Sequence, residues 1–135
     1  VTVKADLKPE EISFNNIDGV VLPGGMPGTV NLGKSETVTK AAVYCAENGK
    51  ITAAICAAPS VLGNLGILKG KKVTCFPGFE KELEGATYTA APVEIDGNVI
   101  TGKGAGCAIL FGKAIVEKAV SAEAANKVCG DMQCP

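Results

Sequence analysis

Hydrophobic positions along this chain alternate between short apolar runs and longer stretches with helical spacing. A continuous apolar run of about four to eight residues that ends in a turn predicts a buried strand. Val93 to Thr101 predicts a hairpin instead, with Asp96-Gly97 at its turn. The predicted single strands are Ile17 to Leu22, Ile51 to Ile55 and Lys72 to Pro77.

Helical spacing follows two of these strands. Ser35 can cap a helix that stops at Gly49, and Pro59 suits the first turn of another, where no N–H group is needed. The apolar face of the helix after Ser35 consists of Val38, Ala41, Ala42 and Cys45.

Two further helices are expected near the end of the chain. The first runs from about Cys107 to Val120 and is apolar nearly all round, with Lys113 and Glu117 as its exposed pair. The second is capped by Ser121 and extends to about Val128.

The alternation of apolar strands and helices predicts an α/β sandwich of three layers, with a mainly parallel sheet covered on both faces. In such sheets ligands bind beyond the carboxyl ends of the strands. The segments expected at that edge are Gly24-Gly25, Cys56-Ala57, Phe76-Pro77 and Gly102 to Gly106.

Composition narrows the class of protein. The 135 residues, 47% of them hydrophobic, predict a single domain that spans residues 1–135. A net charge of −1, no block of Lys and Arg, and only four Phe and two Tyr argue against a nucleic-acid partner. No apolar stretch is as long as a membrane span, and the first residues lack a signal-peptide layout, so we expect no membrane and a cytoplasmic location.

The chain contains six cysteines and no histidine. The absence of histidine excludes a Cys2His2 zinc site and a Cys-His catalytic pair within the chain, and we expect neither a metal nor a cofactor. Cys45 and Cys75 fit core positions, and Cys129 with Cys134 makes only a weak metal signal, so structural thiols are the preferred interpretation.

Cys56 differs from the other cysteines because an apolar strand stops at it and a helix begins at once. A side chain at such a turn points out of the sheet, and the unpaired N–H groups of the helix favour a thiolate. This pattern, a nucleophile elbow, predicts that Cys56 is the reactive residue.

Four motifs in this order resemble the ThiJ/PfpI superfamily, and within it the Parkinson-associated protein deglycase branch with its bacterial relatives. The motifs are Val20 to Gly25, Ala53 to Pro59, Val73 to Pro77 and Gly102 to Gly106. The resemblance implies a flavodoxin-like fold related to class I glutamine amidotransferases, and a homodimer.

The resemblance also implies roles for particular residues. Cys56 is the expected reactive, oxidation-sensitive thiol, and the N–H groups of Gly25 and Ala57 form an oxyanion-hole-like site beside it. Gly24 and Gly25 would let the backbone approach the thiol closely. Further candidate pocket residues are Phe76, Lys103, where a basic residue would hold an anion, Gly104 and Cys107, a second accessible thiol.

Departures from the family limit these roles. Ala57 stands where the protease-like branch has histidine, so a Cys-His peptidase is disfavoured, and Phe76 replaces a histidine that the human branch member has in its pocket. The family's first strand and its glutamate precede residue 1. We therefore expect the domain to be incomplete at its N-terminus, with an apolar cleft and exposed sheet edges, and a separate N-terminal chain is one way to complete it.

Two functions remain open. Cys56 can add to a reactive carbonyl, on a small molecule or a protein adduct, as in glyoxalase or deglycase chemistry. Alternatively, Cys56 is an oxidative-stress sensor, or part of a chaperone, and turns over no substrate. Comparing methylglyoxal consumption by the wild type and Cys56→Ser separates them.

Overall fold

The main sheet has four strands in the order β1-β2-β6-β5, in a computed structural model that describes residues 1–135. β2 pairs in parallel with β1 and β6, whereas β5 pairs antiparallel with β6. The strands are β1 (Gly19–Leu22), β2 (Ile51–Ile55), β5 (Val93–Asp96) and β6 (Val99–Gly102). The sheet is mainly parallel, which confirms the prediction of a mainly parallel sheet.

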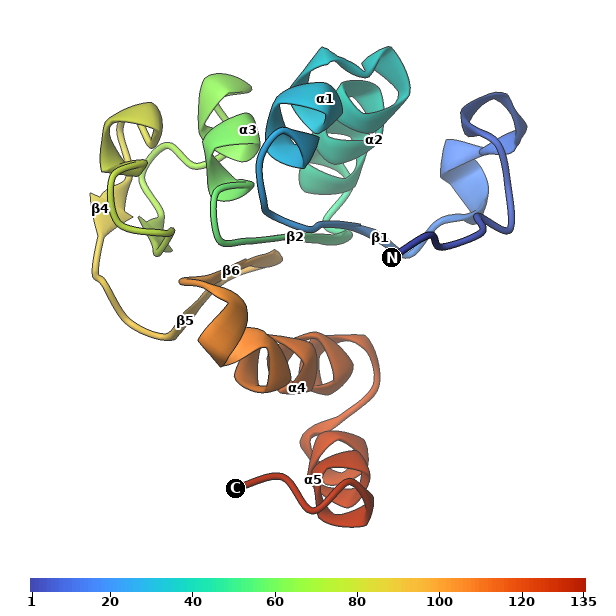
Figure 1. The fold of residues 1–135 in the computed structure, drawn as a ribbon, viewed down its shortest axis with the longest axis vertical. Coiled ribbons are helices and arrows are strands. Elements are labelled where there is room, and N and C mark those ends of the chain that lie inside the picture. The colour runs from blue at the N-terminus through green and yellow to red at the C-terminus, as the bar shows by residue number, and fades with distance from the viewer.

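Helices cover the sheet on two sides, so the molecule is a flavodoxin-like sandwich. In Figure 1, α1, α2 and α3 lie above the sheet, α4 lies below it, and α5 lies beyond α4. The helices are α1 (Gly28–Lys34), α2 (Glu36–Glu47), α3 (Pro59–Asn64), α4 (Ala108–Ala119) and α5 (Ala122–Asp131). Four short 3₁₀ turns span Pro9–Glu11, Phe14–Asn16, Glu80–Glu82 and Ala105–Cys107.

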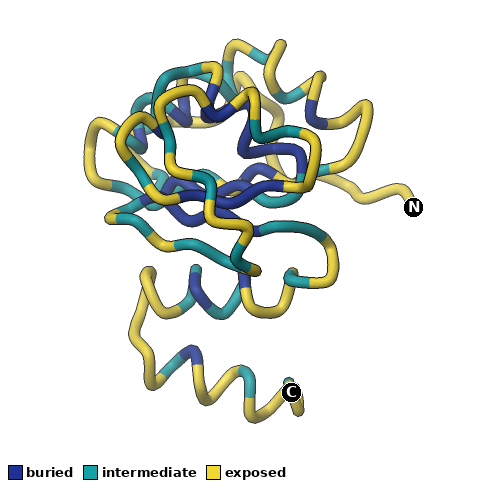
Figure 2. The backbone as a smooth tube through the Cα atoms, turned by 90° about the vertical axis from the view of Figure 1, so that its left-hand side faces the viewer, coloured by how far each residue is buried: buried dark blue, intermediate teal, exposed yellow.

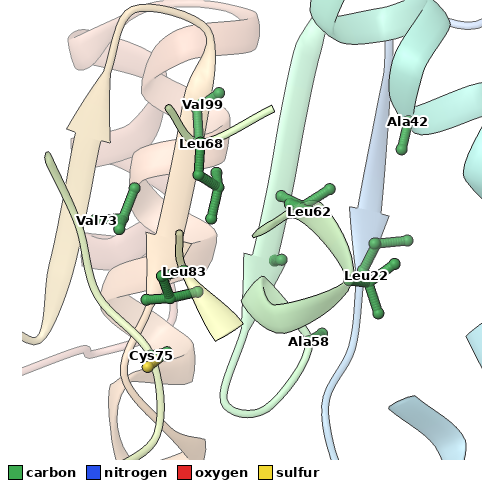
Figure 3. Close-up of a cluster of buried hydrophobic side chains, with 11 residues drawn as sticks. Leu22, Ala42, Ala58, Leu62, Leu68, Val73, Cys75, Leu83 and Val99 are labelled. Atoms are coloured by element: carbon green, nitrogen blue, oxygen red, sulfur yellow. The ribbon is translucent and has the colours of Figure 1, made fainter. Parts of the chain in front are cut away.

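The sheet separates two clusters of buried apolar side chains. The larger cluster lies between the sheet and α2 and α3, and Figure 3 shows Leu62 of α3 beside Leu22 of β1. The smaller cluster comprises Ala53, Ile100, Phe111 and Ala114 on the α4 side. Figure 2 shows the buried backbone concentrated around the strands, whereas both ends of the chain are mostly exposed.

The predicted helix caps are present. The Ser35 hydroxyl accepts a hydrogen bond from the Val38 N–H at 3.4 Å, and the Ser121 hydroxyl accepts one from Ala124 at 3.1 Å. Gly49 follows α2 with a φ of 66°, a conformation that favours glycine. Each of the two serines satisfies an N–H group that would otherwise lack a partner at the start of its helix.

The predicted strand from Lys72 to Pro77 is mostly wrong. Only Lys72–Val73 forms a strand, β3, and it pairs in parallel with β4 (Thr87–Tyr88) in a separate small sheet. The continuation leaves that sheet because the Thr74 N–H donates to the Thr101 hydroxyl of β6 at 2.9 Å. At Thr74 a side-chain acceptor, the Thr101 hydroxyl, therefore takes the place of the carbonyl of a neighbouring strand.

Two smaller expectations also need correction. The register of β5 and β6 pairs Asp96 with Val99, so Gly97-Asn98 forms the hairpin turn rather than Asp96-Gly97. On α4, Lys113 is half-buried, lines the groove between α4 and α5 and forms no ion pair with Glu117.

The four strands pair without a gap, and β1 is an edge of the sheet. Leu22 faces the larger core, whereas the Val21 side chain points to the other face and is 48% exposed. The helix α4 packs on β2, β6 and β5 but leaves this part of the face uncovered. Val21 is therefore an exposed apolar side chain on the edge strand β1.

Candidate functional site

Cys56 occupies the turn between β2 and α3. Its φ is 65°, a left-handed conformation that residues with a Cβ rarely adopt. Two main-chain hydrogen bonds hold it there, because its N–H donates to the Gly102 carbonyl at 2.9 Å and its carbonyl accepts from Phe76 at 2.8 Å. The side chain is half-buried and forms no disulfide. Cys56 therefore lies at a strained strand-to-helix turn, and its role as a nucleophile stays a prediction.

Gly24 makes the close approach to this turn possible. A Cβ at Gly24 would lie 2.5 Å from the Cys56 Cβ and 2.7 Å from the Ile55 carbonyl oxygen. Neither atom can easily move away, because Ile55 ends β2 and the Cys56 backbone is fixed by two hydrogen bonds. The neighbouring Gly25 has a φ of 91°, so it too uses a conformation that favours glycine.

Two N–H groups near the thiol have no hydrogen-bond partner. Neither Gly25 nor Ala57 donates through its backbone N–H, whereas the next amide, that of Ala58, donates to the Ile55 carbonyl. The same Gly24 Cβ position would lie 3.2 Å from the Ala57 nitrogen, which brings the two loops together. Ala57 is held by the Ser60 hydroxyl, which donates to its carbonyl at 2.6 Å. Their role as oxyanion donors stays a prediction.

A second thiol lies close to Cys56 and was not predicted as part of the site. Burial raises the pKa of Cys75 to about 11, with smaller contributions from the negative charge of Glu80 and from Cys56. Glu80 accepts a hydrogen bond from the Gly78 N–H at 2.8 Å, which lowers the pKa of its carboxyl. The pKa of Tyr88 is raised, first by burial and then by Cys75 and Glu80.

This grouping of Cys75, Glu80 and Tyr88 could not be identified from spacing alone. The signal that was available is Pro77-Gly78, which turns the chain back so that Glu80 comes near Cys75. Glu80 is therefore the carboxylate that the structure places among these groups, although no family glutamate matches it in the sequence.

The other predicted pocket residues are partly brought together. Phe76 is 47% exposed, and its ring lies 3.4 Å from where a Cβ of Gly104 would stand, so these two residues are neighbours. Lys103 donates its N–H to Pro92, and Cys107 donates to Gly104. Neither of their side chains forms a hydrogen bond or an ion pair with the Cys56 turn.

A cavity of about 460 Å³ lies between α1 and α3, next to the Gly24-Gly25 turn. Cys56 is not among the residues that line it. Its lining includes Met26 and Thr29, which follow the Gly24-Gly25 turn. The Thr29 hydroxyl donates to the Gly25 carbonyl at 3.0 Å and so ties the loop to α1.

No three Cys, Asp or Glu side chains come together in a way that could hold a metal ion. None of the helices combines the length and apolar character needed to cross a membrane.

Comparison with known proteins identifies the same architecture elsewhere. The chain is 35% identical to the protein DJ-1 homolog B of Arabidopsis thaliana over 134 residues, which is 98% of this chain and 31% of that protein. It is 34% identical to a deglycase of Pyrococcus abyssi over 105 residues, covering 76% of this chain and 62% of the relative. The crystal structure of Drosophila melanogaster DJ-1beta matches with a TM-score of 0.93 and 32% identity.

That structure covers 100% of this chain, while this chain covers 74% of it. The chain spans about a third of the length of the Arabidopsis relative. A model of the DJ-1/PfpI family matches residues 1–118, which include the Gly24-Gly25 turn, the Cys56 turn and Gly102 to Gly106. The chain therefore belongs to the DJ-1/PfpI family.

Proposed function

We propose that this protein is a cysteine-dependent enzyme that acts on reactive carbonyl compounds, with glyoxalase or deglycase chemistry at Cys56. The observation that carries the proposal is the Cys56 turn itself: a strained φ of 65°, two fixing hydrogen bonds and two N–H groups without partners nearby. The deglycase name of the Pyrococcus abyssi relative supports the reaction class. A structural thiol would need none of these features.

The first step is addition of the Cys56 thiolate to the aldehyde carbon of methylglyoxal. A carbon–sulfur bond forms, and the carbonyl π electrons move to oxygen, which becomes an alkoxide. The free N–H groups of Gly25 and Ala57 are the donors available to stabilise that charge. Protonation of the alkoxide gives a hemithioacetal.

Turnover then requires a proton to move from the former aldehyde carbon to the adjacent carbon, which converts the hemithioacetal to a thioester. Water hydrolyses the thioester, releases lactate and regenerates the Cys56 thiol. This chain has no histidine to carry the proton. We propose Glu80 for this role, because its segment is tied to the Cys56 turn by the Phe76 N–H and its carboxylate is held by the Gly78 N–H at 2.8 Å.

The test compares methylglyoxal consumption and lactate formation by the wild type, Cys56→Ser and Cys129→Ser. Cys129 is the matched control because it is also a half-buried free thiol but lies in α5, outside the candidate site. Loss of the nucleophile should lower the rate about 100-fold or more, while Cys129→Ser should retain it. Glu80→Gln should lower lactate formation without preventing hemithioacetal formation. Equal rates in the wild type and Cys56→Ser would overturn the proposal.

The second candidate function is oxidative sensing. It is favoured by the absence of any hydrogen bond from the Cys56 side chain to an acid or base, because sensing needs a reactive thiol but no proton relay. Wild-type protein that consumes no methylglyoxal, yet gains two or three oxygen atoms at Cys56 under peroxide faster than Cys45 does, would favour the sensor.

A further inference from the structure

The end of α5 forms a complete Schellman motif. The Cys134 N–H donates to the Cys129 carbonyl at 2.9 Å, and the Gln133 N–H donates to Gly130 at 3.0 Å. Gln133 has a φ of 54°, the left-handed conformation that this cap requires. The chain therefore folds back over the last turn of α5.

A Schellman motif brings two particular side chains together, those at the third helical position from the end and at the second position beyond the cap. Apolar side chains usually meet there. In this chain both positions are cysteines, Cys129 and Cys134, and both are half-buried free thiols.

The surroundings also bring the two thiols together. Both line one groove of about 370 Å³ between α4 and α5, whose other lining residues are mostly apolar. Burial and the adjacent Cys129 raise the pKa of Cys134, while the Lys113 ammonium acts in the opposite direction. The groove contains no third cysteine and no carboxylate, so a pair of thiols rather than a metal site occupies it.

We propose that Cys129 and Cys134 form a reversible intramolecular disulfide, a modification site separate from Cys56. The oxidant is a small organic disulfide such as oxidised glutathione. The Cys129 thiolate attacks one sulfur of the oxidant, giving a mixed disulfide and one glutathione thiolate. Cys134 then loses its proton, attacks the Cys129 sulfur and releases the second glutathione. Two protein thiols are oxidised, and one glutathione disulfide is reduced to two thiols.

The cap makes this disulfide favourable because the backbone already holds the two residues together before any bond forms. Only the side-chain torsions need to be set, so the second thiol acts at a high effective concentration. In the unfolded chain the same thiols are joined by a flexible segment and meet less often. The folded protein should therefore favour the disulfide over mixed adducts with glutathione.

The experiment equilibrates the full chain in glutathione buffers of stepped redox potential, blocks free thiols and digests with trypsin. Cleavage after Lys127 releases a peptide that begins at Val128 and contains Cys129 and Cys134 but no other cysteine. The disulfide appears by mass spectrometry as an unlabelled peptide that has lost two hydrogen atoms. Its equilibrium constant should be about tenfold or more higher for the folded protein than for the same chain in denaturing urea.

Variants separate the cap from the mere presence of two thiols. Gln133→Gly keeps the left-handed conformation and should keep the folded-state advantage, whereas Gln133→Val, with its branched Cβ, should lose most of it. Cys56→Ser should leave the folded-state advantage unchanged, whether or not the methylglyoxal test shows that Cys56 is catalytic. Equal equilibrium constants in folded and unfolded protein, or only mixed glutathione adducts at Cys129 and Cys134, would overturn the proposal.

Discussion

The Cys56 backbone is strained at the residue that we propose as the nucleophile. Only three residues other than glycine have positive φ values, Cys56, Ala90 and Gln133, and one of them is the predicted nucleophile. A left-handed φ costs a residue with a Cβ about 1 to 2 kcal/mol, and glycine does not bear this cost. The chain nevertheless has a cysteine at this position. The stability of the fold alone therefore does not explain why the residue is not glycine.

We expect Cys56→Gly to be more stable than Cys56→Ala by about 1 kcal/mol, because glycine relieves the left-handed strain that alanine retains. Both variants lack the thiol, so their difference isolates the backbone. Urea unfolding followed by circular dichroism measures it. Cys45, in the interior of α2, is the matched control, and there glycine should be less stable than alanine by about 1 kcal/mol. The same sign at both positions would contradict this account.

Sequence pattern was sufficient to predict that Cys56 lies at a strand-to-helix turn, because a short apolar run and a first-turn proline flank it. That Cys75 and Glu80 lie near Cys56 could not be predicted in the same way. It depends on the Phe76 N–H reaching the Cys56 carbonyl and on the turn at Gly78, which are tertiary contacts.

At the level of elements, the contact between α3 and the 3₁₀ turn Glu80–Glu82 depends on one glycine. A Cβ at Gly63 would lie only 2.0 Å from the Glu82 carbonyl oxygen, so the two segments pack backbone to backbone. Gly112, in α4, has no atom within 4 Å of the same position. The two helical glycines therefore have different reasons to be glycine.

Gly63→Ala should destabilise the protein by about 1 to 3 kcal/mol, because Glu80–Glu82 must move away from α3. Gly112→Ala should stabilise it by up to about 1 kcal/mol through helix propensity. Chemical denaturation of the two variants, each compared with the wild type, gives both signs. If Gly63→Ala is as stable as the wild type, the close approach does not hold in solution.

Elements with strong local signals were predicted, and those held by long-range contacts were not. The α2 helix has a serine cap and an apolar face, so its sequence alone determines it. The α1 helix contains two glycines and lacks a side-chain cap, and β3 and β4 have two residues each, which is too short for any periodicity. They form because the larger core and β6 hold them in place.

At the scale of the whole molecule, buried groups that are neutral when protonated couple stability to alkaline pH. The pKa of Cys75 is raised to about 11 from a reference of 9.0, and burial also raises the pKa values of Cys45 and Tyr88. The unfolded chain therefore loses these protons at a lower pH than the folded protein does.

The resulting stability is complete below about pH 9 and is lost as the pH rises towards about 11. Cys75 alone contributes at most about 2 to 3 kcal/mol to this change. Urea unfolding at intervals between neutral and strongly alkaline pH should show the decline, and Cys75→Ala should make it shallower. An identical decline in Cys75→Ala would show that Cys75 is not responsible.

The layered arrangement of the whole molecule followed from the alternation of strands and helices, since apolar strands need cover on both faces. The pattern did not predict which strands form the edges. Val21 resembles any core valine in the sequence, and its exposure becomes evident only when β1 is placed at the end of the sheet and α4 is seen to cover the other strands.

The two hydrogen bonds that hold the Cys56 peptide units, to Gly102 on one side and to Phe76 on the other, leave the sulfur atom a single freedom of movement. Rotation about the Cα–Cβ bond offers three staggered positions and nothing else. The sulfur therefore occupies one of a few fixed positions, and an incoming molecule must orient itself relative to them. Any group that becomes attached to the Cys56 sulfur starts from one of these positions and must extend away from the end of β2.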